Sequence, residues 1–334
     1  MQAAQVPADE GGYGRSHGLL ADIPTLRLAA LAGIGLLAGG GLFLGDASTW
    51  TAAQSSFMRT PAALLWFLTL DGQWALWLVV AWPLVDQARD LSKAIDLRDR
   101  RRLGGALLLI LALAGLLLVP ASFATPRGVL GWWPLAPIPD YPLRHHDLKI
   151  AIHTIAGSSI ALLAVADILL LRLATGLDRD PAPPAATYDA VHDYLERKDA
   201  LVRLLWVGGA IVFAATLSVG ALRPALVAGD AAAAARFPAT YPTVYGLYLS
   251  GLLALVYVPT YMTFERVGRA LQDLLVPPRN GPLDATDLVA YAAVRRDVEA
   301  ALGLGTGPIA SFKAGAFIFA PLASTIVAQL LPGS

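Results

Sequence analysis

The sequence predicts an all-α polytopic membrane protein, a bundle of seven transmembrane helices. Of its 334 residues, 56% are hydrophobic and 15% are charged, whereas soluble domains carry about 25% charged residues. The apolar residues gather in continuous runs that are long enough for helices to cross the hydrocarbon core. A membrane β-barrel is excluded, because its strands would alternate apolar and polar residues in segments of about ten.

Seven apolar runs approach or meet the length of about 20 residues that one crossing requires. They are Leu28–Gly45, Ala62–Val85, Gly104–Ser122, Leu148–Leu171, Leu204–Leu222, Thr243–Thr263 and Pro308–Leu331. The second run is interrupted by Asp71, Gly72 and Gln73, whereas the third contains no charged residue. We therefore expect seven spans, of which the second is the least regular.

The distribution of basic residues predicts the orientation. With seven spans, the N-terminal segment and the loops 86–103, 172–203 and 264–307 lie on one side, and they carry 18 of the 25 basic residues. The opposite flanks carry only five, which are Arg59, Arg127, Arg144, Arg223 and Arg236. Because Lys and Arg are enriched in cytoplasmic loops, the N-terminus is expected inside the cell and the C-terminus outside.

The same division predicts the domain organisation. Residues 1–27 are expected to form a cytoplasmic tail rather than a signal peptide, because they lack a short basic n-region. Residues 28–334 are expected to form one transmembrane domain. Its loops 86–103, 172–203 and 264–307 are longer than unstructured connections usually are and show apolar residues at helical spacing. We expect their helices to pack as a small cytoplasmic cap; the alternative is a docking surface for a cytoplasmic protein partner.

Asp71 and Gln73 are the first candidate site residues, because polar groups inside spans are costly and often functional. If the second span is continuous, Asp71 lies near the middle of the bilayer and is a candidate for binding an ion or a proton. The alternative is that the span starts near Trp74 and that Asp71 lies in an outer re-entrant turn.

The fourth span carries the second set of candidates, since His146, Lys149, His153 and Asp167 share one helix face at about 100° per residue. One interpretation is a salt-bridged packing face; the other is a histidine switch or proton relay. A metal or haem site is not expected, because His146 and His153 lie about 10 Å apart along the axis and no other span contains histidine. Asp71, Gln73, His153 and Asp167 are thus the candidate ion- or substrate-binding residues, with no cofactor.

Glycines in the first span predict close helix packing. Gly35 and Gly39, and Gly41 and Gly45, form two motifs of small residues four positions apart, a spacing that lets helix backbones approach each other. The contact they make is expected within the chain or, as the alternative, in a homo-oligomer.

Several function classes are excluded or disfavoured by composition. A net charge of zero argues against nucleic-acid binding, and the absence of cysteine excludes disulfides, thiolate metal sites and a cysteine nucleophile. No common hydrolase, metalloprotease or nucleotide-binding motif occurs in the loops, so an enzyme is not favoured, although it is not ruled out.

The leading prediction is permeation or transport of a small solute or ion through the bundle, in a bacterial cytoplasmic (inner) membrane. The first alternative is a sensory or scaffolding protein whose cytoplasmic helices bind a partner. The second is a subunit of a membrane redox or enzyme complex. Beyond the lipid bilayer, the expected partners are a cytoplasmic protein or a second copy of the chain.

Overall fold

The computed structural model describes residues 25–93, 95–123, 145–175, 187–229, 241–278 and 284–305, and all regular elements within these ranges are helices. In chain order they are α1 (Thr25–Leu44), η1 (Ala47–Thr49), α2 (Ala52–Met58), α3 (Pro61–Lys93), α4 (Leu97–Phe123), α5 (His146–Ala174), α6 (Thr187–Gly229), α8 (Tyr241–Leu275) and α9 (Ala285–Ala301). The prediction of an all-helical protein is confirmed for these residues.

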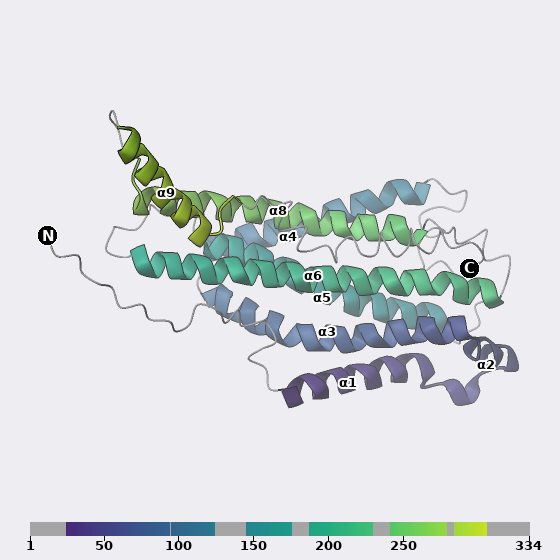
Figure 1. The fold of residues 1–334 in the computed structure, drawn as a ribbon. Coiled ribbons are helices and arrows are strands. Elements are labelled where there is room, and N and C mark those ends of the chain that lie inside the picture. Colours follow the sequence, from purple (N-terminus) through teal and green to yellow (C-terminus); the bar gives the residue numbers. More distant parts are fainter. Residues whose placement is uncertain are drawn as a thin grey trace.

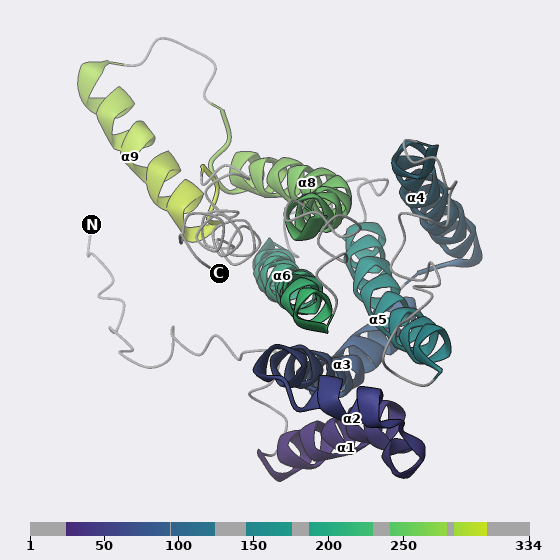
Figure 2. The same cartoon turned by 90° about the vertical axis from the view of Figure 1, so that its right-hand side faces the viewer.

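The long helices lie side by side and alternate in direction, as Figure 1 and the view along the bundle in Figure 2 show. One end of the bundle holds the C-terminal ends of α3, α5 and α8 and the N-terminal ends of α4 and α6. The inclined helix α9 lies at this same end (Figure 1). The alternation brings together the segments that carry most of the basic residues of the described chain.

Among the described residues, five helices are long and apolar enough to cross a membrane, which indicates a membrane-integral protein. The five segments are Thr25–Thr49, Pro61–Lys93, Leu148–Ala174, Tyr188–Ala228 and Pro242–Leu275. The run expected as the third span is helical in α4 but is not among these five. The expected seventh span, at 308–331, lies outside the described residues, so the count of seven and the orientation stay predictions.

Several of the predicted loop segments are, where the structure describes them, helical extensions of the spans. Helix α3 continues to Lys93 and α4 begins at Leu97, so most of the loop 86–103 belongs to the ends of these two helices. Helix α6 begins at Thr187 and α8 continues to Leu275, well beyond the apolar runs. Asp284 precedes helix α9, and its side chain accepts a hydrogen bond from the backbone N–H of Asp287 at 2.7 Å, as an N-cap residue does.

Contacts with α6 and α8 hold α9 at the end of the bundle. The ammonium of Lys198 on α6 donates to the carbonyl oxygens of Leu302 and Gly303, at 2.9 and 2.6 Å. The guanidinium of Arg295 pairs with Asp273 on α8 at 2.8 Å. Hydrogen bonds with Tyr291 and Asp273 raise the pKa of Arg295, so the guanidinium stays charged.

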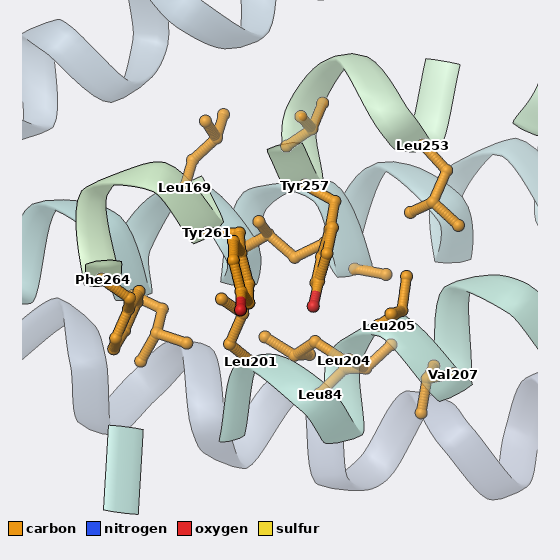
Figure 3. Packing of buried hydrophobic residues seen from close by; sticks show 14 of the residues in the cluster. Leu84, Leu169, Leu201, Leu204, Leu205, Val207, Leu253, Tyr257, Tyr261 and Phe264 are labelled. Carbon is orange, nitrogen blue, oxygen red and sulfur yellow. The ribbon is translucent and has the colours of Figure 1, made fainter. Parts of the chain in front are cut away.

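Two clusters of buried apolar side chains hold the bundle together. The larger one joins α3, α5, α6 and α8, and Figure 3 shows Leu84, Leu204, Tyr257 and Tyr261 interlocked in it. The smaller cluster joins α1 and α2 to α3, to the start of α5 and to the last turns of α6. Because lipid tails are as apolar as the side chains, such packing stabilises a membrane bundle mainly through close van der Waals contact.

Candidate functional site

Three buried polar side chains follow one inward-facing line on α5. They are Lys149, His153 and Asp167, which are 6%, 8% and 0% exposed. Lys149 and Asp167 are separated by roughly five helical turns and therefore project in the same direction. Most of the expected polar face of the fourth span is thus turned into the bundle; the side chain of His146 lies outside the described residues.

A chain of two hydrogen bonds joins α5, α3 and α6 at His153. The Nε2 atom of His153 lies 2.9 Å from Oε1 of Gln73 on α3. The amide nitrogen of Gln73 in turn donates to the carbonyl oxygen of Ala214 on α6 at 2.7 Å. Gln73 is only 2% exposed, so this chain lies inside the bundle and links two of the residues that the sequence predicted.

Aromatic rings enclose His153 on α5. The ring centroids of Phe43 and Trp74 lie 5.9 and 6.1 Å from that of His153, and Trp77 approaches to 4.6 Å. Gly157 makes the approach of Trp77 possible, because a Cβ atom there would lie 2.6 Å from the indole ring. His153 is therefore surrounded by rings from α1 and α3, and its Nδ1 has no hydrogen-bond partner within the described chain.

Asp71 lies within an unbroken α3, so the chain makes no turn at this position, and the helix Pro61–Lys93 that contains it is long and apolar enough to cross a membrane. Its carboxylate packs against the backbone of α1, in contact with the position where Gly39 lacks a side chain. The Oδ1 atom is buried without a hydrogen-bond partner among the described residues, whereas the carboxylate also meets the backbone N–H of Gly40. Asp71 is thus beside the His153 network, two residues before Gln73, without being bonded to it.

The ammonium of Lys149 has two hydrogen-bond acceptors, at the end of the bundle opposite α9. It donates to Oδ1 of Asp46 at 2.7 Å and to the carbonyl oxygen of Phe43 at 3.1 Å. The indole nitrogen of Trp50 donates to the same Oδ1 at 3.0 Å. Lys149 therefore closes the C-terminal end of α1, where backbone carbonyls lack helical partners, and acts as a structural residue.

Asp167 contrasts with Lys149, because neither of its carboxyl oxygens has a partner among the residues that the structure describes. Its neighbour in sequence, Arg172, is exposed, and the ion pairs of the described chain do not include these two residues. Asp167 and His153 are 14 residues apart, roughly 21 Å along α5. The four predicted residues thus lie at two separate sites. Asp71, Gln73 and His153 lie close together, and Asp167 lies apart from them.

The glycines of α1 divide into two groups. Gly35 lies against α3, where an added Cβ would be 2.5 Å from Cα of Ala75, and Gly39 lies against Asp71 and Trp74. Gly41 has open space around its Cβ position, and Gly45 meets only the backbone of Gly41. The first motif is thus in contact with α3 of the same chain.

Sequence reasoning did not identify Phe43, Trp74 and Trp77 as neighbours of His153, or Asp46 as the partner of Lys149. The tryptophans follow Gln73 by one and by four positions in the printed sequence, and the second spacing, one helical turn, is a usable signal. Phe43 and Asp46 are more than a hundred residues from the α5 residues they contact, and no sequence pattern indicates those contacts.

No family model, curated protein or solved structure matches the chain. Within the described ranges, no group of three or more His, Cys, Asp or Glu side chains is arranged to hold a metal ion.

Proposed function

We propose that this membrane-integral protein moves a small ion or solute across the bilayer through its helical bundle. The proposal rests on one observation: the His153–Gln73–Ala214 chain is buried where α3, α5 and α6 meet, yet Nδ1 of His153 has no described partner. Polar groups at membrane depth are costly and usually face a pathway or one another. A group whose hydrogen-bonding capacity is only partly used is poorly explained by packing alone.

A purely structural role fits Lys149 better than it fits the other polar residues of α5. Lys149 has a carboxylate and a backbone carbonyl as partners, whereas His153 and Asp167 leave buried atoms unused. The difference supports a role for His153 and Asp167 in binding something that enters the bundle.

Reconstitution into liposomes tests the proposed function. Purified protein is tested for flux of protons, Na⁺, K⁺, Cl⁻ and small neutral solutes, beside protein-free vesicles. We expect flux of one class above the protein-free rate, and a rate about tenfold lower in Gln73→Leu, equivalent to ~1.4 kcal/mol. Ser159→Ala is the matched control, because Ser159 is exposed on α5 and bonds only to its own helix. Absence of flux in every class would contradict the proposal.

We also propose seven spans, with the N-terminus in the cytoplasm and the C-terminus outside, in a bacterial cytoplasmic membrane. The division of basic residues supports this orientation. The chain contains no cysteine, so single-cysteine variants can be labelled without a background. Ala53→Cys in α2 should react with a membrane-impermeant thiol reagent added outside, and Ala292→Cys in α9 only after permeabilisation; the reverse pattern would overturn the orientation.

A second candidate function, docking of a cytoplasmic protein, is favoured by the surface of α9. Leu288, Val289 and Val294 are 53%, 70% and 52% exposed, although the helix is anchored to the bundle at its other end. A photoreactive side chain at Val289 should give a discrete cross-linked product in cells, and one at the exposed Asp189 should not. Identical products at both positions would count against a specific partner.

A further inference from the structure

Two buried groups on the inward line of α5 keep atoms that can bind protons. These atoms are Nδ1 of His153 and both carboxyl oxygens of Asp167, and none of them has a hydrogen-bond partner in the described parts of the chain. Both side chains are more than nine-tenths buried. Since buried polar atoms in proteins are nearly always paired, these three atoms are candidates for binding a proton, and Oδ2 of Asp46, Oδ1 of Asp71 and Nε1 of Trp74 are likewise buried without a described partner.

The amide of Gln73 determines which nitrogen of His153 is free. The amide nitrogen donates to the carbonyl of Ala214, which leaves the amide oxygen facing Nε2 of His153. An amide oxygen only accepts hydrogen bonds, so Nε2 must carry the hydrogen. The flipped amide would place two acceptor oxygens against each other at Ala214. In the neutral ring Nδ1 therefore carries an unshared lone pair, and an incoming proton can bind only there.

Asp167 is fully buried, and three nearby residues of its own helix are apolar core residues. Its α5 neighbours Ala164, Ile168 and Leu171 belong to the larger core cluster, which also includes residues of α6 and α8. An ionised carboxylate here would have neither a hydrogen bond nor an ion pair among the described residues. A charge in such surroundings is so unfavourable that the group takes up a proton instead. The geometry thus favours a neutral carboxylic acid at this position.

The helices packed against α5 offer few charged groups at this depth. Between Arg203 and Arg223 of α6, and between Asp71 and Asp86 of α3, there is no charged residue. Other ionisable groups on facing elements include Asp46 of the α1–α2 connection, Asp99, Arg100, Arg101 and Arg102 of α4, and Tyr245, Tyr248, Tyr257, Tyr261 and Glu265 of α8. The remaining ones lie mostly at the ends of α3, α6 and α8 nearest to α9. None of these groups is hydrogen-bonded or ion-paired to His153 or Asp167.

We propose that His153 and Asp167 are proton-binding sites and that the proton is the species moved by the transport function proposed above. A metal cation needs several ligands at once, and the described residues contain no group of three ionisable ligands. A solute needs space beside His153, where aromatic rings pack closely. A proton needs only one lone pair, so it fits both places as they stand.

The chemical change at each site is a reversible proton transfer. His153 gains a proton at Nδ1 and becomes an imidazolium, whereas Asp167 releases a proton from its carboxyl group and becomes a carboxylate; each reverses when the proton moves on. The separation of roughly 21 Å along α5 excludes direct transfer between them. The two groups are therefore separate sites, which can be tested one at a time.

Infrared spectroscopy tests Asp167 in the full-length protein in lipid nanodiscs. We expect a C=O stretch of a protonated carboxylic acid, above the amide I band, that disappears in Asp167→Asn. It should persist in Asp86→Asn, because Asp86 is exposed on α3. The band should also shift in D₂O, because the carboxyl proton exchanges with solvent. An identical band in wild type and Asp167→Asn, or no such band in wild type, would overturn the assignment.

Nitrogen NMR of histidine-labelled protein tests His153. The chain has five histidines, and the signal of interest is assigned by its loss in His153→Gln but not in His192→Gln, an exposed position. We expect protonated Nε2 and unprotonated Nδ1 near neutral pH, and protonation of Nδ1 on acidification while the protein stays folded. The opposite tautomer, or an Nδ1 signal that does not change, would overturn the assignment.

The spectroscopic and flux measurements separate this inference from the proposed function on which it rests. If both sites bind protons but no ion or solute crosses the membrane, transport fails and the proton sites stand. If another ion is transported and neither site exchanges a proton, transport stands and the proton assignment fails.

Discussion

Lys149 and Asp167 lie on the same face of α5, about five turns apart, but they differ in their hydrogen-bond partners. The ammonium of Lys149 has a carboxylate and a carbonyl within hydrogen-bond distance. The carboxyl oxygens of Asp167 have no partner among the described residues. A charged residue inside a span is therefore not evidence of function by itself; what counts is whether the surrounding helices complete its bonds.

The largest loss of stability is expected for substitution of Lys149, whose ammonium has hydrogen-bond partners. Lys149→Met should lower the free energy of unfolding by about 3 kcal/mol, because it leaves the carboxylate of Asp46 without its ion-pair partner. Unfolding in detergent micelles, followed by circular dichroism, measures it. Lys93→Met is the control, since Lys93 and Asp90 form an exposed pair that should make no measurable difference. Equal effects would contradict a structural role for Lys149.

Stability should also depend on side-chain size where α1 packs against α3. Gly35→Ala places a Cβ 2.5 Å from backbone Cα of Ala75, which should cost about 2 kcal/mol through overpacking. Gly41→Ala meets open space and should be neutral or stabilising by up to about 1 kcal/mol, because Ala favours the helix. The same unfolding assay measures both variants. A loss of stability or of oligomeric state in Gly41→Ala would instead place the interface of a homo-oligomer there.

A smaller loss of stability is expected for substitution of Gln73 on α3 or His153 on α5. Gln73→Leu removes the acceptor of the histidine and the donor to Ala214, and hydrogen bonds between membrane helices contribute about 1 kcal/mol. A double-mutant cycle with His153→Leu should show a coupling of similar size. Additive effects would mean that the bond does not exist in the membrane.

The smallest effect on stability is expected at Asp167. Asp167→Asn preserves the shape of a neutral carboxylic acid, so the free energy of unfolding should change by less than about 1 kcal/mol. Thermal unfolding of the two proteins in the same nanodiscs measures the difference. A loss as large as that of Lys149→Met would show that Asp167 is ionised and paired with something in the folded protein, which would remove the contrast between the two residues.

Much of the helical architecture was predictable from the sequence, because apolar runs of this length have few alternatives to helices in lipid. The extension of the later spans into long helices followed from periodicity, as α6 and α8 show. The short helix α2, which begins with a capping box at Thr51 and Gln54, was not predicted. Its signal is only four residues long and lies beside a dominant apolar run.

The candidate site was predictable by residue type but not by pairing. Asp71, Gln73, His153 and Asp167 were identified because polar groups are rare in spans, but the sequence gives no distance between residues of different helices. The partnership of Gln73 with His153, and of Lys149 with Asp46, depends on how α1, α3 and α5 pack. The lack of a hydrogen-bond partner for Asp167 among the described residues depends on the same packing.

Proton flux into liposomes tests the central claim most directly. Wild type, Asp167→Asn and Asp86→Asn are reconstituted at equal density with a pH-sensitive dye inside, and a potassium gradient with valinomycin supplies the driving force. We predict that wild type and Asp86→Asn acidify the lumen at the same rate and that Asp167→Asn falls to the protein-free rate. Equal proton flux in Asp167→Asn and wild type would contradict the claim.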